Sequence, residues 1–307
     1  MKYELKIEHA DDQNGSIDLQ RLTSIADSLR KISEGALQLR LKGLSKAKKT
    51  IKLNDALKIS LTGIQKGSTI LCLESEKFEK TLSGYQTDIF MLGHQQELLE
   101  KTPIALFVES FEEALNNPND SELLDKPLLK ELLKFKKSFL KEGEVFSIQN
   151  EGSFQKLTLT KSHFSKIQIA EEEIPQPESA IVNGTIEELT YSKLKVKIQT
   201  NEGIVDGFLS ESMNPDEIKG WWGRGATIAG TMHYKPGRKS IFEIDRIFKS
   251  EPGDEFFSKK QKHESLEEQI ERQLQEGKEN NPLNMIVGTW PGEETDEEFE
   301  ALLNDLG

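Results

Sequence analysis

Residues near the C-terminus combine features that suit the capture of a protein partner. Trp290 is followed by a Pro-Gly turn, and Thr295 and Glu298 have the spacing of a helix capping box. Four apolar residues then recur at helical spacing, and every charged residue from 293 to 307 is acidic. We expect an anchor tryptophan followed by an amphipathic helix that lies in a groove of the partner. The residues expected to contact the partner are Ile286, Trp290, Pro291, Glu293, Glu294, Asp296, Glu297, Glu298, Phe299, Leu302, Leu303 and Leu306.

An alternative for the same segment is a structural role. A capped helix with one narrow apolar stripe cannot build a core alone, so it must cover a surface of another molecule or of its own chain. In the second case the helix would fold back on the N-terminal domain as a cap.

A second candidate site combines basic and aromatic residues between positions 190 and 240. Aromatic rings beside bases suit stacking on single-stranded nucleic acid. Alternating lysines are equally typical of a strand that faces solvent, and Trp221 and Trp222 are expected to pack in the core or at an edge. The candidate nucleic-acid-binding residues are Lys193, Lys195, Lys197, Tyr234, Arg238 and Lys239.

Signals for catalysis are weak. Each of the five histidines stands alone, without a second ligand at the spacing that a metal site needs. The glycines of 63–68 lack a Gly-Lys-Ser/Thr ending, and those of 220–225 do not match a dinucleotide-binding fingerprint. The sequence favours a binding protein, with no catalytic residues, no metal and no cofactor expected.

Composition narrows the class of protein further. The net charge of −13 means that the overall field does not attract nucleic acid, so such a role needs a local basic face. One cysteine in 307 residues excludes a disulfide framework and fits a reducing compartment. No apolar run approaches the roughly 20 residues of a membrane span, and a cytoplasmic protein is expected.

Three segments must position these residues. Residues 1–170 alternate helical and strand patterns and are predicted to form an α+β domain. A proline-bearing charged stretch, 171–177, is predicted to be a hinge. Residues 178–250 are predicted to form a small all-β barrel, and 251–307 a partly disordered acidic arm that ends in the amphipathic helix.

Within the first segment, residues 3–9 alternate as a half-buried strand does, and 18–37 show helical spacing. Residues 57–62 and 69–73 are predicted to form a hairpin, and two further helices are expected over 94–116 and 121–142. Ser121 is a possible cap of the second, and Pro127 within its pattern indicates an alternative start just before that proline. In the second segment, five short strands in about 70 residues favour a closed or nearly closed barrel of OB or SH3-like type. The expected strands are 180–187, 193–199, 204–209, 226–234 and 240–248.

Three stretches resemble antitoxin-like proteins of prokaryotic toxin–antitoxin modules that are encoded beside PIN-domain ribonucleases. These stretches are residues 32–41, 61–71 and, most specifically, 286–299 with its Trp-Pro-Gly and acids. The resemblance implies that the acidic tail lies in the basic substrate groove of a PIN-domain ribonuclease toxin and excludes RNA. Trp290 and the stripe from Phe299 to Leu306 would supply affinity, and the acids would steer association.

The chain departs from typical antitoxins in one respect. Those proteins are short and carry a small DNA-binding head, whereas this chain has two substantial domains and no helix-turn-helix pattern. Operator binding is therefore not expected. Two hypotheses remain: an antitoxin-type inhibitor that acts through the tail, and a nucleic-acid-binding protein that uses the barrel.

Overall fold

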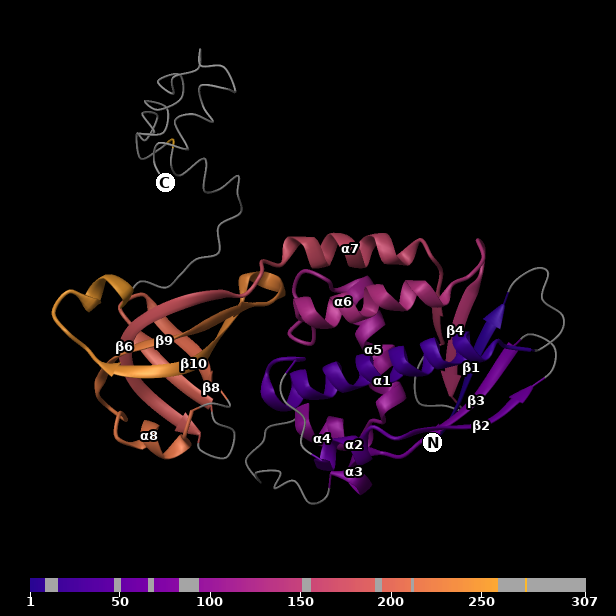
Figure 1. The fold of residues 1–307 in the computed structure, drawn as a ribbon, viewed down its shortest axis with the longest axis horizontal. Coiled ribbons are helices and arrows are strands. Elements are labelled where there is room, and N and C mark those ends of the chain that lie inside the picture. Colours follow the sequence, from indigo (N-terminus) through magenta and orange to yellow (C-terminus); the bar gives the residue numbers. More distant parts are fainter. Residues whose placement is uncertain are drawn as a thin grey trace, which may run out of the picture. The chain divides into compact units, whose positions relative to one another are not determined.

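The protein is described from a computed structural model, which divides the chain into a compact unit of residues 1–260 and a second unit of residues 261–307. The described residues are 1–8, 16–46, 51–65, 69–82, 94–150, 156–190, 195–210, 213–258 and 274. Helices and strands gather in one part of the first unit and strands alone dominate the other (Figure 1). An α+β segment followed by a barrel is thereby confirmed.

The α+β part is built on a five-stranded antiparallel sheet with the order β2-β3-β1-β4-β5. Tyr3, Leu5 and Ile7 are buried while the alternate residues of β1 are partly exposed, as the sequence pattern predicts. The strands are β1 (Lys2–Glu8), β2 (Ile59–Gln65), β3 (Thr69–Ser75), β4 (Val145–Asn150) and β5 (Leu157–Leu159).

Helices α1, α5, α6 and α7 lie together on one side of this sheet (Figure 1). Their core is rich in phenylalanine: Phe111 lies with its ring centroid 5.7 Å from that of Phe135, and Phe135 lies 5.3 Å from Phe146 of β4. The helices are α1 (Leu19–Lys42), α2 (Ile51–Ala56), α3 (Phe78–Thr81), α4 (His94–Glu100), α5 (Pro103–Asn116), α6 (Lys126–Phe135) and α7 (His163–Glu173).

One predicted helix is divided, and the next begins directly before Pro127, at the alternative start that this proline indicates. The pattern over 94–116 is divided at Thr102, whose hydroxyl accepts the amide of Ala105 and caps α5. The next helix begins at Lys126, and its cap is Asp125 rather than Ser121. Asp125 is buried and accepts hydrogen bonds from the Leu128 amide (2.9 Å) and from both the amide and the hydroxyl of Ser45.

The barrel is closed by five strands in the order β10-β8-β7-β6-β9. Neighbouring strands are antiparallel except β8 and β10, which are parallel, and helix α8 separates β8 from β9 along the chain. All five strands lie close to their predicted positions. They are β6 (Glu178–Thr190), β7 (Lys195–Thr200), β8 (Gly203–Leu209), β9 (Gly225–Tyr234) and β10 (Ser240–Lys249); α8 is Pro215–Lys219.

Close strand packing requires glycine at one position of β9. A Cβ atom on Gly230 would lie 1.9 Å from the carbonyl oxygen of Glu243 on β10, closer than any side chain tolerates. The β9–β10 pairing shifts register immediately afterwards, between Ile244 and Arg246. The glycine and the bulge therefore act together where β10 bends around the barrel.

The segment predicted to be a hinge begins instead as the last turn of α7, which ends at Glu173. The Lys126 amine donates hydrogen bonds to the carbonyl oxygens of Glu171 (2.7 Å) and Ile174. The turn after β9 also contacts the α+β part, where Lys239 forms a 2.7 Å ion pair with Glu122. Residues 1–260 accordingly form one compact unit.

Candidate functional site

The predicted partner-binding residues, from Ile286 to Leu306, all lie outside the described residues. Lys193 and the side chain of Arg238 are likewise outside them. The predicted site residues whose side chains the structure describes, Lys195, Lys197, Tyr234 and Lys239, all belong to the barrel.

Two of the predicted nucleic-acid-binding lysines lie on β7 and face outward. Lys195 is paired in register with Phe208 of β8, and Lys197 with Asp206. The Lys197 amine is 2.6 Å from the carboxylate of Glu188, and this hydrogen bond raises the pKa of Lys197. Its charge is thus balanced by a carboxylate of the neighbouring strand β6.

The ring of Tyr234 is not exposed on the barrel surface, as stacking on a nucleic-acid base would require. Its side chain is buried, with 6% of the residue exposed, and its hydroxyl donates a hydrogen bond to Glu178. Burial, followed by the bond to Glu178, raises the pKa of Tyr234. The ring packs in the barrel and is not presented to a ligand.

The turn between β9 and β10 carries Lys235 and Lys239. Lys239 is paired with Glu122, which compensates its charge. Lys235 is half-buried, and this burial lowers its pKa. The nearby carboxylates of Asp125 and Glu122 raise the pKa of Lys235. The positive charges of Lys195 and Lys239 lower it further. Lys195, at the start of β7, thus adds positive charge to the surroundings of Lys235.

A polar and aromatic cluster on the outer face of the barrel was not predicted. His233 of β9 lies 2.9 Å from the carboxylate of Glu243 on β10, and its ring centroid is 6.4 Å from that of Phe208 on β8. These residues come together only because β8 pairs with β10 across the barrel closure. No spacing along the chain relates them.

The two adjacent tryptophans have different environments. Trp221 is half-buried against the core, as expected, whereas Trp222 is 67% exposed. The indole N–H of Trp222 donates to the carbonyl oxygen of Glu187 at 2.9 Å, which holds the ring at the surface. Trp221 therefore packs against the core, whereas Trp222 lies at the edge of β6, where it bridges to Ile186.

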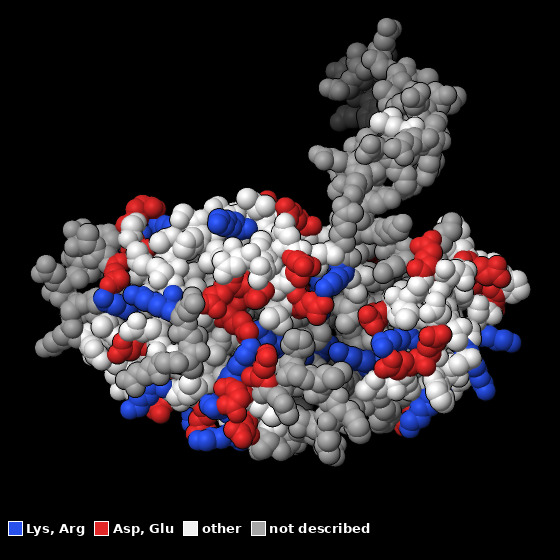
Figure 2. All heavy atoms as spheres, turned by 180° about the vertical axis from the view of Figure 1, so that it is seen from behind, with Lys and Arg blue, Asp and Glu red and all other residues white. Residues whose placement is uncertain are grey.

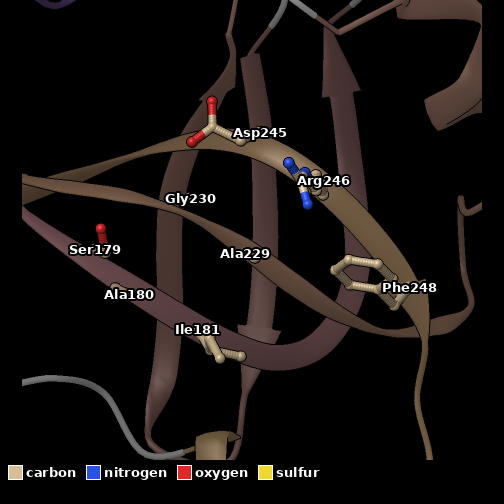
Figure 3. Close-up of a pocket in the computed structure, with 8 residues that line it drawn as sticks. All are labelled: Ser179, Ala180, Ile181, Ala229, Gly230, Asp245, Arg246 and Phe248. Carbon is tan, nitrogen blue, oxygen red and sulfur yellow. The ribbon is translucent and has the colours of Figure 1, made fainter.

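A groove crosses the outer surface of β6, β9 and β10 (Figure 3). It has a volume of about 620 Å³, which is within the range of ligand sites. Ile181, Ala229, Arg246 and Phe248 are among the residues that line it. None of them was predicted as a site residue.

Charges of both signs are interspersed on the face of the molecule that Figure 2 shows. This distribution does not form the single-sign field that concentrates a polyanion. Within the described ranges no group of three or more His, Cys, Asp or Glu side chains is arranged to hold a metal ion, and none of the helices there has the length and apolar character of a membrane span.

Comparison of the chain with known protein families, with curated proteins and with solved structures finds no match. The function must therefore be argued from the residues and the geometry themselves.

Proposed function

We propose that this chain is an antitoxin-type binding protein, which captures and neutralises a ribonuclease of the PIN-domain class through its C-terminal segment. The observation that carries the proposal is the distribution of charge. Residues 261–307 contain 13 acids and 3 bases, so they hold −10 of the net charge of −13. A ribonuclease binds a polyanion, and a chain segment of this charge suits the same surface.

The body of the protein does not need this segment to complete its core. The barrel closes on itself, and the helices cover the buried face of the sheet, within residues 1–258. The proposal places the apolar side chains of the tail, with Trp290 first among them, in a groove of the partner. Each such side chain contributes roughly 1.5–3 kcal/mol to the binding free energy when fully buried. Ordering the segment on binding costs about 2–5 kcal/mol.

The test compares the intact chain with the variants Trp290→Ala and Leu302→Ser. Each chain is tagged, and bound proteins are recovered from cells of the source organism. We expect the intact chain to retain a ribonuclease and to inhibit its cleavage of RNA, and each variant to lose at least tenfold in inhibition. Leu140→Ser is the matched control, because Leu140 is an exposed leucine of the body. Equal inhibition by all four chains would contradict the proposal.

A second candidate function is nucleic-acid binding by the barrel. It is favoured by the strand order, since an antiparallel meander β6-β7-β8, a parallel β8–β10 pair and a helix before β9 are the arrangement of an OB-type barrel. Barrels of that type bind oligonucleotides on their second and third strands and on the loops at one end. Lys195 of the second strand, β7, and Lys235 of the loop after the fourth strand, β9, belong to this region.

The two candidates differ in their response to salt and to loss of the tail. If the barrel binds nucleic acid, the affinity falls steeply with salt, and removing residues 282–307 strengthens it because an internal polyanion is lost. Fluorescence anisotropy with a labelled single-stranded oligonucleotide measures both effects. A double variant, Lys195→Gln with Lys235→Gln, is expected to weaken binding only under the second candidate.

A further inference from the structure

The groove of Figure 3 is lined by residues of three neighbouring strands, β6, β9 and β10. Ile181 of β6 and Phe248 of β10 lie on either side of Ala229, which belongs to β9 between them. Phe248 is 50% exposed and Ile181 39% exposed, so both present apolar surface to solvent. A planar group that lies between them would cover this surface while the small side chain of Ala229 leaves it room.

The β-bulge of β10 adds polar groups to the rim. Ile244 is opposite Gly230 and Arg246 is opposite Ala229, so Asp245 is the extra residue of the bulge. As a result both Asp245 and Arg246 are exposed on the outer surface. Bulges of this kind often direct a side chain towards a binding site.

Arg246 differs from the basic residues considered so far. Lys197 and Lys239 each have a carboxylate partner, at 2.6 Å and 2.7 Å. Among the described residues, no acid forms an ion pair with Arg246. A guanidinium group is well shaped to hold a phosphate, which it binds through two parallel hydrogen bonds.

We propose that this groove binds a nucleotide unit, with the base against Phe248 and Ile181 and the phosphate on Arg246. Two exposed apolar side chains beside a cation match the two halves of that ligand, and stacking of a base on an aromatic side chain tolerates any sequence. The same chemistry is offered by a free nucleotide and by a single strand.

The site lies on β6, β9 and β10, away from the β7–β8 surface that the second candidate function uses. The groove contains neither Lys195 nor Lys235, which the second candidate function uses. The double variant of those two lysines therefore tests the second candidate function, whereas Phe248→Ser and Arg246→Gln test this inference.

The experiment titrates the full chain with AMP, adenosine, UMP and a short oligoadenylate by isothermal titration calorimetry. We expect AMP to bind more tightly than adenosine, because of the phosphate, and more tightly than UMP, because the larger purine covers more of Phe248 and Ile181. Tighter binding of the oligoadenylate than of AMP supports the proposal with a single strand as the source. Equal binding of the two supports it with a free nucleotide as the source.

Three variants probe the groove. Phe248→Ser should weaken AMP binding roughly tenfold, and Arg246→Gln should abolish the preference for AMP over adenosine. Ala229→Leu places a larger side chain in the groove and should weaken AMP binding. The strand itself should persist, because Ala229 is partly exposed and a strand tolerates leucine at such a position. Circular dichroism and thermal melting check that each variant is folded.

A charge-matched control is Lys219→Gln on α8, which is expected to leave AMP binding unchanged. The proposal is overturned if none of the four ligands binds at millimolar concentration, or if Lys219→Gln weakens binding as much as Arg246→Gln. It is also overturned if an acidic peptide with a central phenylalanine binds the groove more tightly than AMP and loses this affinity on Phe248→Ser.

Discussion

At the scale of single residues, the least exposed ion pair joins Arg21 of α1 to Glu144, which precedes β4. The Glu144 carboxylate is 2.8 Å from the guanidinium and is wholly inaccessible as a side chain, and one of its oxygens has no hydrogen-bond partner among the described residues. Arg21 also donates to the carbonyl oxygen of Ser138 and lies over the ring of Phe146. It thus ties α1 to the sheet.

We expect Arg21→Met to destabilise the protein by about 3–5 kcal/mol, since it leaves a buried carboxylate without its cation. Urea unfolding measures the change. The double variant Arg21→Met with Glu144→Leu should recover most of it, because the buried charge is then absent. Lys134→Met is the control: its pair with Glu131 is exposed and contributes at most about 1 kcal/mol. A loss of the same size in Lys134→Met would contradict this account.

At the scale of elements, α5 contains three acids on its partly exposed side. Burial, with Glu109 and Glu113 nearby, raises the pKa of Glu112 above its ordinary value of 4.5. A raised carboxyl pKa means that the folded state binds the proton more tightly than the unfolded chain. Stability from this group is therefore complete below pH 4.5 and is lost as the pH rises through the raised pKa.

Glu112→Gln removes the ionised carboxylate and should stabilise the protein at pH 7 by roughly 0.5 kcal/mol, the size of a like-charge pair on a helix. The difference from the parent chain should vanish near pH 4, where both side chains are neutral. Urea unfolding at the two pH values tests this. A gain that is equal at both would show that charge is not the cause.

At the scale of the whole molecule, the α+β part and the barrel belong to one compact unit. Lys239 is paired with Glu122, and Gly237 in the same turn lies against Asp120. We therefore expect residues 1–260 to unfold in one cooperative transition.

The tryptophans allow a direct test of this cooperativity. In a Trp290→Phe background, fluorescence reports only on Trp221 and Trp222 of the barrel, whereas far-UV circular dichroism reports mainly on the helices. Phe111→Ala in the helical core and Phe242→Ala in the barrel should each cost about 3–5 kcal/mol and move both signals together. Two separate transitions would show that the parts are independent.

Local patterns were sufficient for most of the elements. The alternation of apolar and polar residues was sufficient to predict β1 and the five barrel strands. A strand with one buried face has an apolar residue at every second position. Helix boundaries were less well predicted: Ser121 and Asp125 are both good capping residues. Pro127 in the first turn favours Asp125, and the contact with Ser45 adds a reason that only the tertiary structure supplies. The tail's capping box and acidic stripe are likewise properties of the chain alone.

Closure of the barrel determines the orientation of side chains that the alternation of apolar and polar residues does not predict. Whether Tyr234 faces the core, and whether Trp222 faces solvent, depends on strand register and on the turn that precedes β9. The groove at Phe248 and Arg246 requires three strands that meet across the sheet and a bulge that shifts one of them. Sequence periodicity describes one element at a time, so sites made by pairing between distant segments become visible only in the tertiary structure.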